Sequence, residues 1–180
     1  FNIYIINNGS TDNTKNIVAE YCKLDNRIKY YELEYANLTK ALCFALEVIK
    51  EKYILRIDSG DISDINRVRK TLIFMDKNKD CALSYTDFYV KEGKKKKLFK
   101  LPNTIRKRDF IYKNKLAHST LCLRKETLSN INLSYSGVKG AKAYFGPSQD
   151  LLLLCIAKFA YELKIEKVPN TYTEITKNIK

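Results

Sequence analysis

Strand patterns and helix patterns alternate over the first 78 residues of this 180-residue chain. Three short apolar runs predict buried strands, and each is followed by a segment whose apolar residues recur at helical spacing. Strands joined through helices run parallel, and helices then cover both faces of the sheet. The pattern predicts an α/β fold with a mostly parallel sheet, with strands at 2–6, 28–33 and 53–57 and helices that extend to about residues 22, 49 and 78.

The second half of the chain breaks this alternation. A strand is expected at 82–85, followed by a hairpin at 89–98 whose tip is rich in lysine. Further on, the patterns predict a strand at 121–123, a short helix from Lys125, a loop at 134–147, an apolar helix at 151–161 and a last strand near 171–175. No repeat or linker divides the chain, so we expect a single domain over residues 1–180.

The third strand pattern ends in two carboxylates, Asp58 and Asp61. In open α/β sheets, ligands bind at the carboxyl ends of the strands, so this is a place for a metal, a ribose or a phosphate. A polar loop followed by a helix cap at Ser63 explains the same residues without a ligand. The stretch alone does not decide between these two interpretations.

The net charge of +13 favours an anionic partner, although the many lysines, asparagines, isoleucines and tyrosines are also typical of an AT-rich genome. No apolar run approaches the roughly 20 residues that span a bilayer. The five cysteines lie apart among apolar neighbours, which favours buried free thiols in a reducing compartment over disulfides or a zinc site.

Several short motifs, taken in order, resemble those of the inverting GT-A glycosyltransferases of family 2. The turn Asn7–Thr14 is similar to the family's D-D/N-G-S-T-D-x-T motif, and Tyr53–Ser63 is similar to its Y-I-x-x-x-D-x-D-D-x-S segment. Ser148–Asp150 resembles its E/Q-D motif before an apolar helix. Ala36–Leu42 and Ala117–Thr120 resemble two further segments of the family. The resemblance implies a GT-A, Rossmann-like α/β domain.

The resemblance also implies roles for individual residues. Asp150 would be the general base that takes the proton of an acceptor hydroxyl, although a helix N-cap is its structural alternative. Asp58, Asp61 and His118 would be the candidate ligands of Mn²⁺ or Mg²⁺. The implied nucleotide-sugar contacts are Asn7, Asn8, Gly9, Ser10, Asp12, Lys40, Asp58 and Ser59.

Three departures from the family bear on the site. Gly60 stands where the family carries the second Asp of D-x-D, usually the direct metal ligand, so either Asp61 supplies that ligand or the metal is bound weakly or not at all. Asn7 replaces the leading Asp that recognises the base. Nothing matches the family's opening strand, of the type V-S-I-I-I-P-x-Y-N. We therefore expect the chain to lack the family's first strand and helix.

The resulting expectation is an enzyme that transfers a sugar, with inversion, from a nucleotide-diphosphate donor to a glycan or lipid-linked acceptor in surface polysaccharide or glycoconjugate synthesis. A UDP-sugar is the favoured donor, and the expected location is cytoplasmic, with an anionic membrane face as a further candidate surface for the basic segment. The alternative is a degenerate, non-catalytic GT-A-like module that binds nucleotide, glycan or protein. A nucleic-acid partner is not expected, because no stacking or groove-reading motif accompanies the charge.

Overall fold

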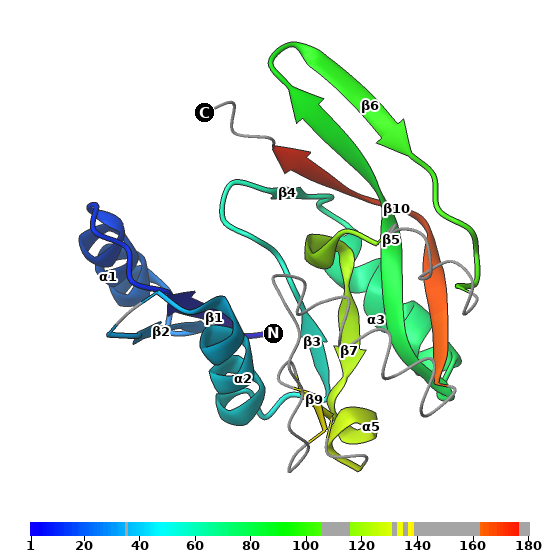
Figure 1. Cartoon of the computed structure of the whole chain (residues 1–180), viewed down its shortest axis with the longest axis horizontal. Helices are drawn as coiled ribbons and strands as arrows, with labels where there is room; N and C mark the ends of the chain where they lie inside the picture. Colours follow the sequence, from blue (N-terminus) through cyan, green and yellow to red (C-terminus); the bar gives the residue numbers. More distant parts are fainter. Residues whose placement is uncertain (35, 106–115, 131–132, 135–136, 139–162, 177–180) are drawn as a thin grey trace.

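The computed structural model describes residues 1–34, 36–105, 116–130, 133–134, 137–138 and 163–176 (Figure 1). Several expectations lie outside the described residues. They are the motif Ser148–Asp150, the apolar helix at 151–161 and most of the loop at 134–147.

The first half of the chain forms the predicted alternation of strands and helices. β1 and β2 pair in parallel, with Ile3 opposite Ile28 and Asn7 opposite Glu32. Apolar residues on one side of each helix face the strands, and Val18, Ala41 and Leu42 are buried. The elements are β1 (Ile3–Asn7), α1 (Thr14–Leu24), β2 (Ile28–Glu32), α2 (Leu38–Val48) and β3 (Tyr53–Leu55).

The helix after β3 begins later than its apolar pattern indicated. Ser63, expected to cap that helix, instead lies in the two-residue strand β4 (Ile62–Ser63), which pairs antiparallel with Thr173 and Glu174. The helix α3 covers Arg67–Lys77, and the Asp64 carboxylate accepts a hydrogen bond of 2.8 Å from the Asn66 amide just before it. The pairing of β4 joins residues that are far apart in the chain, so no local sequence pattern predicts it.

The larger sheet has the strand order β3-β7-β5-β10-β4, and β6 pairs with the later part of β5, Phe88–Glu92, on the edge opposite β10. It is mixed rather than mostly parallel, since of its described pairs only β5 with β10 is parallel. β5 returns directly into β6 through a tight turn at Gly93 (φ +58°), and such a turn can join only antiparallel strands. These strands are β5 (Cys81–Glu92), β6 (Lys95–Phe99), β7 (Cys122–Arg124) and β10 (Lys164–Thr176).

The remaining described elements are short. They are the 3₁₀ turn η1 (His118–Thr120), the helix α5 (Lys125–Asn130) and the two-residue strands β8 (Leu133–Ser134) and β9 (Gly137–Val138). The predicted hairpin at 89–98, the strand at 121–123 and the helix from Lys125 are confirmed. The strand predicted near 171–175 is part of the longer β10, and the one at 82–85 is part of β5. No helix in the described part of the chain is long and apolar enough to cross a membrane.

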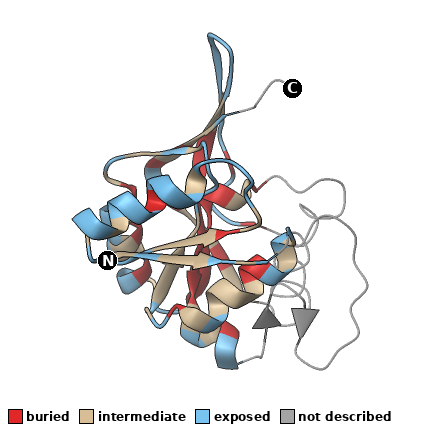
Figure 2. Ribbon diagram, turned by 90° about the vertical axis from the view of Figure 1, so that its left-hand side faces the viewer, coloured by how far each residue is buried: buried red, intermediate tan, exposed pale blue. Residues whose placement is uncertain are grey.

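The core lies mainly in the larger sheet, and Met75 of α3 packs there with Cys81 and Cys122. Figure 2 shows the buried residues concentrated in the central strands. Leu83, Tyr85 and Ile165 are fully buried there. Arg124 is also buried and donates hydrogen bonds to the carbonyl oxygens of Cys81, Met75 and Asn78 at 2.8 to 2.9 Å. Its guanidinium therefore joins the end of α3 to the start of β5.

Candidate active site

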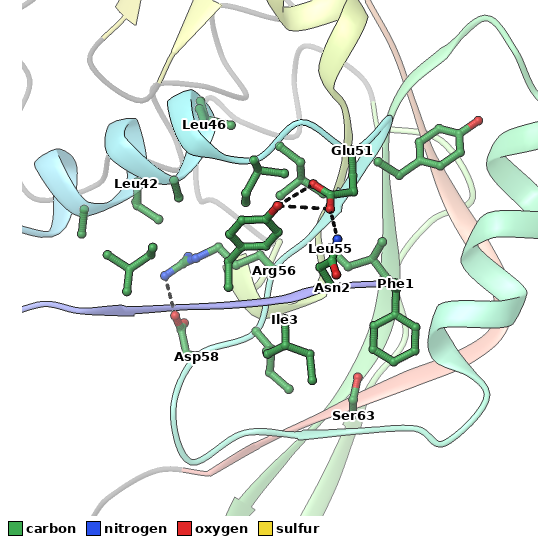
Figure 3. A pocket seen from close by; sticks show the side chains of 18 of the residues that line it. Phe1, Asn2, Ile3, Leu42, Leu46, Glu51, Leu55, Arg56, Asp58 and Ser63 are labelled. Carbon is green, nitrogen blue, oxygen red and sulfur yellow. Dashed lines mark hydrogen bonds and ion pairs between the residues drawn. The ribbon is translucent and has the colours of Figure 1, made fainter. Parts of the chain in front are cut away.

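A cavity of about 590 Å³ separates β1 from β3 (Figure 3). Helix α2 supplies much of its apolar lining, including Leu42 and Leu46. One end is marked by Glu51, whose carboxylate accepts hydrogen bonds from Asn2 and from the Tyr4 hydroxyl. The other end lies at the carboxyl ends of the strands, where the candidate polar residues gather. These are Asn8, Arg56, Asp58, Ser59, Ser63 and Arg67.

The turn after β1 is held by its own side chains. The buried Asn7 accepts a 2.9 Å hydrogen bond from the Ser10 amide through Oδ1 and donates one of 2.7 Å to the Tyr30 hydroxyl through Nδ2. Asn8 Oδ1 accepts from the Asn37 amide at 2.7 Å and so ties this turn to the start of α2. The Asn7 amide therefore shapes the turn, and both of its ends already have protein partners.

Gly9 and Asp12 complete this turn. Gly9 has φ +78°, a left-handed conformation in which a side chain would be strained. Asp12 accepts hydrogen bonds from the hydroxyl and the amide of Thr14 at 2.5 and 3.0 Å, and the hydroxyl contact is the main cause of the lowered pKa of Asp12. A carboxylate at this point also compensates the free N–H groups at the start of α1.

Asp58 is held by two residues, one from its own strand end and one from another element. Its Oδ1 forms an ion pair with the Arg56 guanidinium (Figure 3). Its Oδ2 accepts from the Ser119 hydroxyl at 3.0 Å, and the same hydroxyl oxygen accepts from the Asp58 amide at 3.1 Å. The orientation of this carboxylate is therefore set by the protein, while about half of its surface stays open to solvent.

Asp61 belongs to the same turn but has a different partner. The Asp61 amide donates to the Asp58 carbonyl at 3.1 Å, and Asp61 Oδ1 accepts from the Thr176 amide at 3.1 Å. Between the two acids, Gly60 has φ +90°, and nothing lies within 4 Å of the position that its Cβ would take. The backbone of the turn, rather than crowding, thus accounts for a glycine where the family carries a carboxylate.

The buried cation Arg67 lies behind this turn. Its guanidinium donates to the Arg56 carbonyl at 2.9 Å, to the Leu121 carbonyl at 3.3 Å and to the Ser63 hydroxyl at 3.2 Å. Burial lowers the pKa of Arg67 to about 10, so the group stays protonated at neutral pH. Arg67 Nε and Arg56 Nη1 are buried without a hydrogen-bond partner among the described residues. Both arginines line the cavity beside Asp58.

The predicted metal ligands do not form a site. No group of three or more His, Cys, Asp or Glu side chains in the described ranges is close enough to hold a metal ion. Asp58 is paired with Arg56 and Ser119, Asp61 binds the end of β10, and His118 lies in η1. These donors do not fit a resident Mn²⁺ or Mg²⁺ site, which needs several free oxygen ligands.

The structure brings Asn8, Asp58 and Ser59 together at one cavity. Lys40 is exposed in the first turn of α2, with its amide bonded to Asn37 Oδ1 at 2.9 Å. Asn37 is thereby the N-cap of α2. Asp150 lies outside the described residues.

Three residues at the site were not assigned a role from the sequence: Arg56, Arg67 and Ser119, although Ser119 lies in the segment Ala117–Thr120 that resembles the family. Arg56 and Arg67 lie on either side of Asp58 and Asp61 in the sequence. Nothing in the pattern distinguishes them from ordinary charged residues of a strand and a helix. The signal for Ser119 is the antiparallel register of β3 and β7, which pairs Leu55 with Cys122. Continued by three residues, that register sets Ser119 opposite Asp58, but it is visible only once the pairing is known.

Comparison with known proteins agrees with this geometry. The family model for glycosyl transferase family 2 matches residues 1–130. The chain belongs to glycosyl transferase family 2. It is 33% identical over 129 residues to the O-antigen biosynthesis glycosyltransferase WbnJ of Escherichia coli, covering 70% of this chain and 50% of WbnJ. It is 34% identical over 85 residues to the putative teichuronic acid biosynthesis glycosyltransferase TuaG of Bacillus subtilis, covering 47% of this chain and 33% of TuaG.

Solved structures confirm the GT-A fold. S. aureus TarS 1-349, in complex with UDP-GlcNAc, matches 100% of this chain and 50% of its own chain with a TM-score of 0.72 at 17% identity. GalNAc-T7, crystallised with UDP, GalNAc and Mn²⁺, matches 99% of this chain and 38% of its own with a TM-score of 0.69 at 13% identity. The family 2 chain described here thus spans half the length of WbnJ and less of other relatives.

Proposed function

We propose that this family 2 protein transfers a sugar, with inversion, from a nucleotide-diphosphate donor to a glycan or lipid-linked acceptor. The observation that carries the proposal is the oriented Asp58 carboxylate at the carboxyl end of β3, beside two arginines and the turn after β1. A UDP-sugar is the favoured donor, supported by the UDP-sugar bound to TarS, and surface polysaccharide synthesis is supported by the names of WbnJ and TuaG.

In this proposal, the positive charge at the cavity serves the donor phosphates. Arg56 Nη1 is a buried donor without a partner among the described residues, and Arg67 remains protonated behind it. A departing diphosphate gains negative charge in the transition state, and fixed cations in a poorly hydrated site stabilise that charge. Asp58 and Ser59 would hold the ribose and the turn Asn7–Asp12 the base.

The reaction itself is a substitution at the anomeric carbon. The acceptor oxygen forms a bond to that carbon on one face while the bond to the phosphate oxygen breaks on the other, and the configuration inverts. The hydroxyl proton passes to the Asp150 carboxylate as general base. The nucleoside diphosphate leaves with the electron pair of the broken bond.

The described carboxylates and histidine do not fit a resident metal site. We therefore propose that Arg56 and Arg67 stabilise the charge of the leaving diphosphate. The alternative is a divalent cation that is held mainly by the phosphates of the donor. Measuring donor turnover with and without Mn²⁺ tests this alternative. The presence of Mn²⁺ among the ligands of GalNAc-T7 is the reason to include it.

The acceptor side of the proposal involves the basic hairpin. The strand β6 carries Lys95, Lys96 and Lys97 on a projecting hairpin (Figure 1), where Lys96 forms an ion pair with Glu174. Exposed lysines favour a surface that presents phosphates, such as a lipid-linked acceptor at the cytoplasmic face of an anionic membrane. The proposal treats residues 1–180 as one domain.

The decisive experiment measures donor turnover. The chain, and a form extended to the length of its relatives, should consume one of several UDP- and GDP-sugars in the presence of membrane extract as acceptor, with and without Mn²⁺. Asp150→Asn should abolish transfer while leaving UDP binding intact. Absence of turnover in both forms, or unchanged turnover in Asp150→Asn, contradicts the proposal.

A second function is favoured by one specific observation. Both oxygens of Asp58 already have protein partners and Gly60 supplies no carboxylate, which suits a non-catalytic module that binds nucleotide without metal. Calorimetry separates the two functions. Tight UDP binding that Mn²⁺ does not change, together with no turnover of any donor, would favour the binding module.

A further inference from the structure

The larger sheet carries a cluster of aromatic and charged side chains at the end where the hairpin of β5 and β6 projects (Figure 1). Glu174 of β10 is paired with Tyr89 of β5, and Lys91 of β5 is paired with Lys96 of β6. Paired residues lie on the same face of a sheet, and so do residues two positions apart in one strand, which adds Tyr172. These five side chains therefore share one face. We call this surface the hairpin platform.

The hairpin platform lies on the face of the sheet opposite to α3. Arg67 of α3 donates to the Ser63 hydroxyl, and Ser63 is paired with the buried Thr173. Thr173 and Glu174 follow one another in β10, so their side chains point to opposite faces. The two platform lysines have 48% and 46% of their side-chain surface exposed. The platform is therefore accessible from solvent.

The two tyrosines of the platform form an aromatic pair. Their ring centroids are 5.4 Å apart, and the ring planes are inclined by 44°. The Lys96 ammonium lies 4.4 Å from the centroid of the Tyr89 ring, and because Lys96 is itself exposed, this face of the ring borders solvent. Sugar rings have a face of C–H groups that packs on aromatic rings, and tyrosine adds a hydroxyl for hydrogen bonding. The tyrosine pair therefore suits a pyranose ring, for which the flexible stem of Lys96 can move aside.

The charges of the platform are unequal in number. Glu174 Oε2 accepts a hydrogen bond from the Lys96 ammonium, and Glu174 Oε1 lies 3.8 Å from Lys91 Nζ. The hydrogen bond from Lys96 is the main cause of the lowered pKa of Glu174, so this carboxylate is ionised at neutral pH. Two ammonium groups thus share one carboxylate, which leaves positive charge for an anionic group of a ligand. The carboxylate itself can accept hydrogen bonds from sugar hydroxyls.

The platform borders the turn that carries Asp58. Thr176 is paired with Lys91, and the Thr176 amide donates to Asp61 Oδ1 at 3.1 Å. The Asp61 amide in turn donates to the Asp58 carbonyl at 3.1 Å. A ligand on the platform therefore lies next to the proposed donor site, where an acceptor has to be.

We propose that the hairpin platform binds an anionic glycan, with a sugar ring against the two tyrosines and its carboxylate or phosphate group on Lys91 and Lys96. The glycan is then the acceptor of the proposed transferase function, on which its role as a substrate rests. Its binding needs no donor, so binding and transfer are measured separately.

An anionic membrane would contact the same hairpin in a different way. A layer of lipid headgroups attracts cations on any face and offers no sugar ring to the tyrosines. Lys95 and Lys97 lie on the opposite face of the hairpin, where Lys97 is paired with Val90 and its ammonium lies 5.3 Å from the centroid of the Phe99 ring. Each face thus carries two lysines of the paired strands, but the tyrosine pair and Glu174 accompany only one of these lysine pairs.

Calorimetry with the whole chain, without donor and at about 0.15 M salt, tests the proposal, since this salt screens diffuse attraction. The probes are trigalacturonate and a hyaluronan tetrasaccharide, and each is compared with its methyl ester, which keeps the sugar rings and removes the charge. At least one acidic probe should bind with a Kd of about 1 mM or below, and about tenfold more tightly than its ester.

Two pairs of lysine substitutions locate the charged part of the site. Lys91→Gln combined with Lys96→Gln should weaken binding of the acidic probe about tenfold, because it removes two charge-assisted contacts. Lys95→Gln combined with Lys97→Gln removes the same charge from the opposite face and should weaken binding less than about twofold.

A matched pair of substitutions also tests the aromatic part. Tyr89→Leu keeps an apolar side chain and removes the ring, so it should weaken binding about fivefold. Phe99→Leu makes the same kind of change on the opposite face of the hairpin and should leave binding unchanged.

Binding of neither acidic probe, equal binding of each probe and its ester, or equal losses from the two lysine pairs would overturn the proposal. Equal losses together with binding to vesicles of phosphatidylglycerol would assign the hairpin to a membrane surface instead. Sugar transfer without glycan binding at the platform would contradict the platform alone, whereas glycan binding without any transfer would contradict only the proposed function.

Discussion

The N-terminal unit, from β1 to α2, and the larger sheet with α3 bury their apolar side chains to very different depths. In the larger sheet and α3, Met75, Leu83 and Leu123 are buried to 1% exposure or less. In the N-terminal unit, Leu24 is 82% exposed and Tyr21 is 57% exposed. Both regions have strand and helix patterns of similar clarity in the sequence. The difference shows that forming the helices and strands of a βαβ unit does not by itself bury their apolar side chains. Burial also depends on which elements pack against the remaining face and edge of the sheet.

The four described cysteines offer the largest contrast between the regions. Cys22 and Cys43 are half-buried in the N-terminal unit, while Cys81 and Cys122 are buried in the larger sheet. Burial raises the pKa of Cys81 to about 11 and that of Cys122 to about 12. At pH 8 only about one in a thousand Cys81 thiols, or fewer for Cys122, is then ionised, and both thiols are covered.

Alkylation by iodoacetamide at pH 8, followed by peptide mass spectrometry, should therefore modify Cys22 and Cys43 at least a hundredfold faster than Cys81 and Cys122. The folded thiols keep their protons above the ordinary pKa of 9.0, so their contribution to stability is complete below pH 9 and is lost as the pH rises toward 11. Similar rates for all four thiols would mean that the larger sheet opens as readily as the N-terminal unit.

Two arginines provide the next contrast. Arg124, in the larger sheet, donates to three carbonyl groups and to the Tyr53 hydroxyl, whereas Arg27 forms an exposed ion pair with Asp25. Arg124→Met leaves buried carbonyl groups without donors and should lower the free energy of unfolding by about 3–4 kcal/mol. Arg27→Met should cost less than about 1 kcal/mol.

Urea denaturation followed by circular dichroism measures both values. If the two substitutions cost the same, the distinction between a packed and an unpacked region is wrong for polar groups. A loss for Arg124→Met confined to the local amides around α3 would show that the guanidinium fastens only that helix.

Ser119 tests the contribution of the larger-sheet region to the site, because its hydroxyl contacts Asp58. Ser119→Ala removes the hydroxyl that orients Asp58 and should weaken UDP binding, or donor turnover, about tenfold with little change in melting temperature. Thr120→Ala is the matched control, because the neighbouring Thr120 hydroxyl donates to the Ala117 carbonyl and does not contact Asp58. Calorimetry with UDP distinguishes them. Equal effects of both substitutions would assign Ser119 a purely structural role.

Gly60→Ala should lower stability only slightly. A side chain at φ +90° costs about 1 kcal/mol, since nothing lies near the missing Cβ to add a clash. Gly60→Asp, which restores the carboxylate of the family motif, should cost about the same and should make UDP binding more dependent on Mn²⁺. Thermal unfolding and calorimetry with and without Mn²⁺ measure the two effects. A loss of several kcal/mol would indicate that the turn is packed more tightly than the structure shows.

The features predicted correctly from the sequence are those that depend on local pattern. The alternation from β1 to β3 follows from apolar spacing, and the hairpin of β5 and β6 follows from a glycine between two strand patterns. The antiparallel position of β7 and the strand β4 depend on pairings between residues far apart in the chain, such as Ser63 with Thr173, which leave no local signal. This is also why Asp58 was identified and its partner Ser119 was not.

At Gly60, the backbone conformation restricts the chirality of the residue, whereas the surrounding space does not restrict its size. L-amino acids are strained at φ +90°, but their mirror images favour that region, and the space beside Gly60 is open. A semisynthetic chain with D-alanine at this position should therefore keep the turn that carries Asp58 and fold more stably than the natural chain, by about 0.4–1 kcal/mol, because the unfolded chain loses conformational freedom. The turn next to the proposed donor site thus constrains the chirality of its third residue and leaves the volume of that residue free.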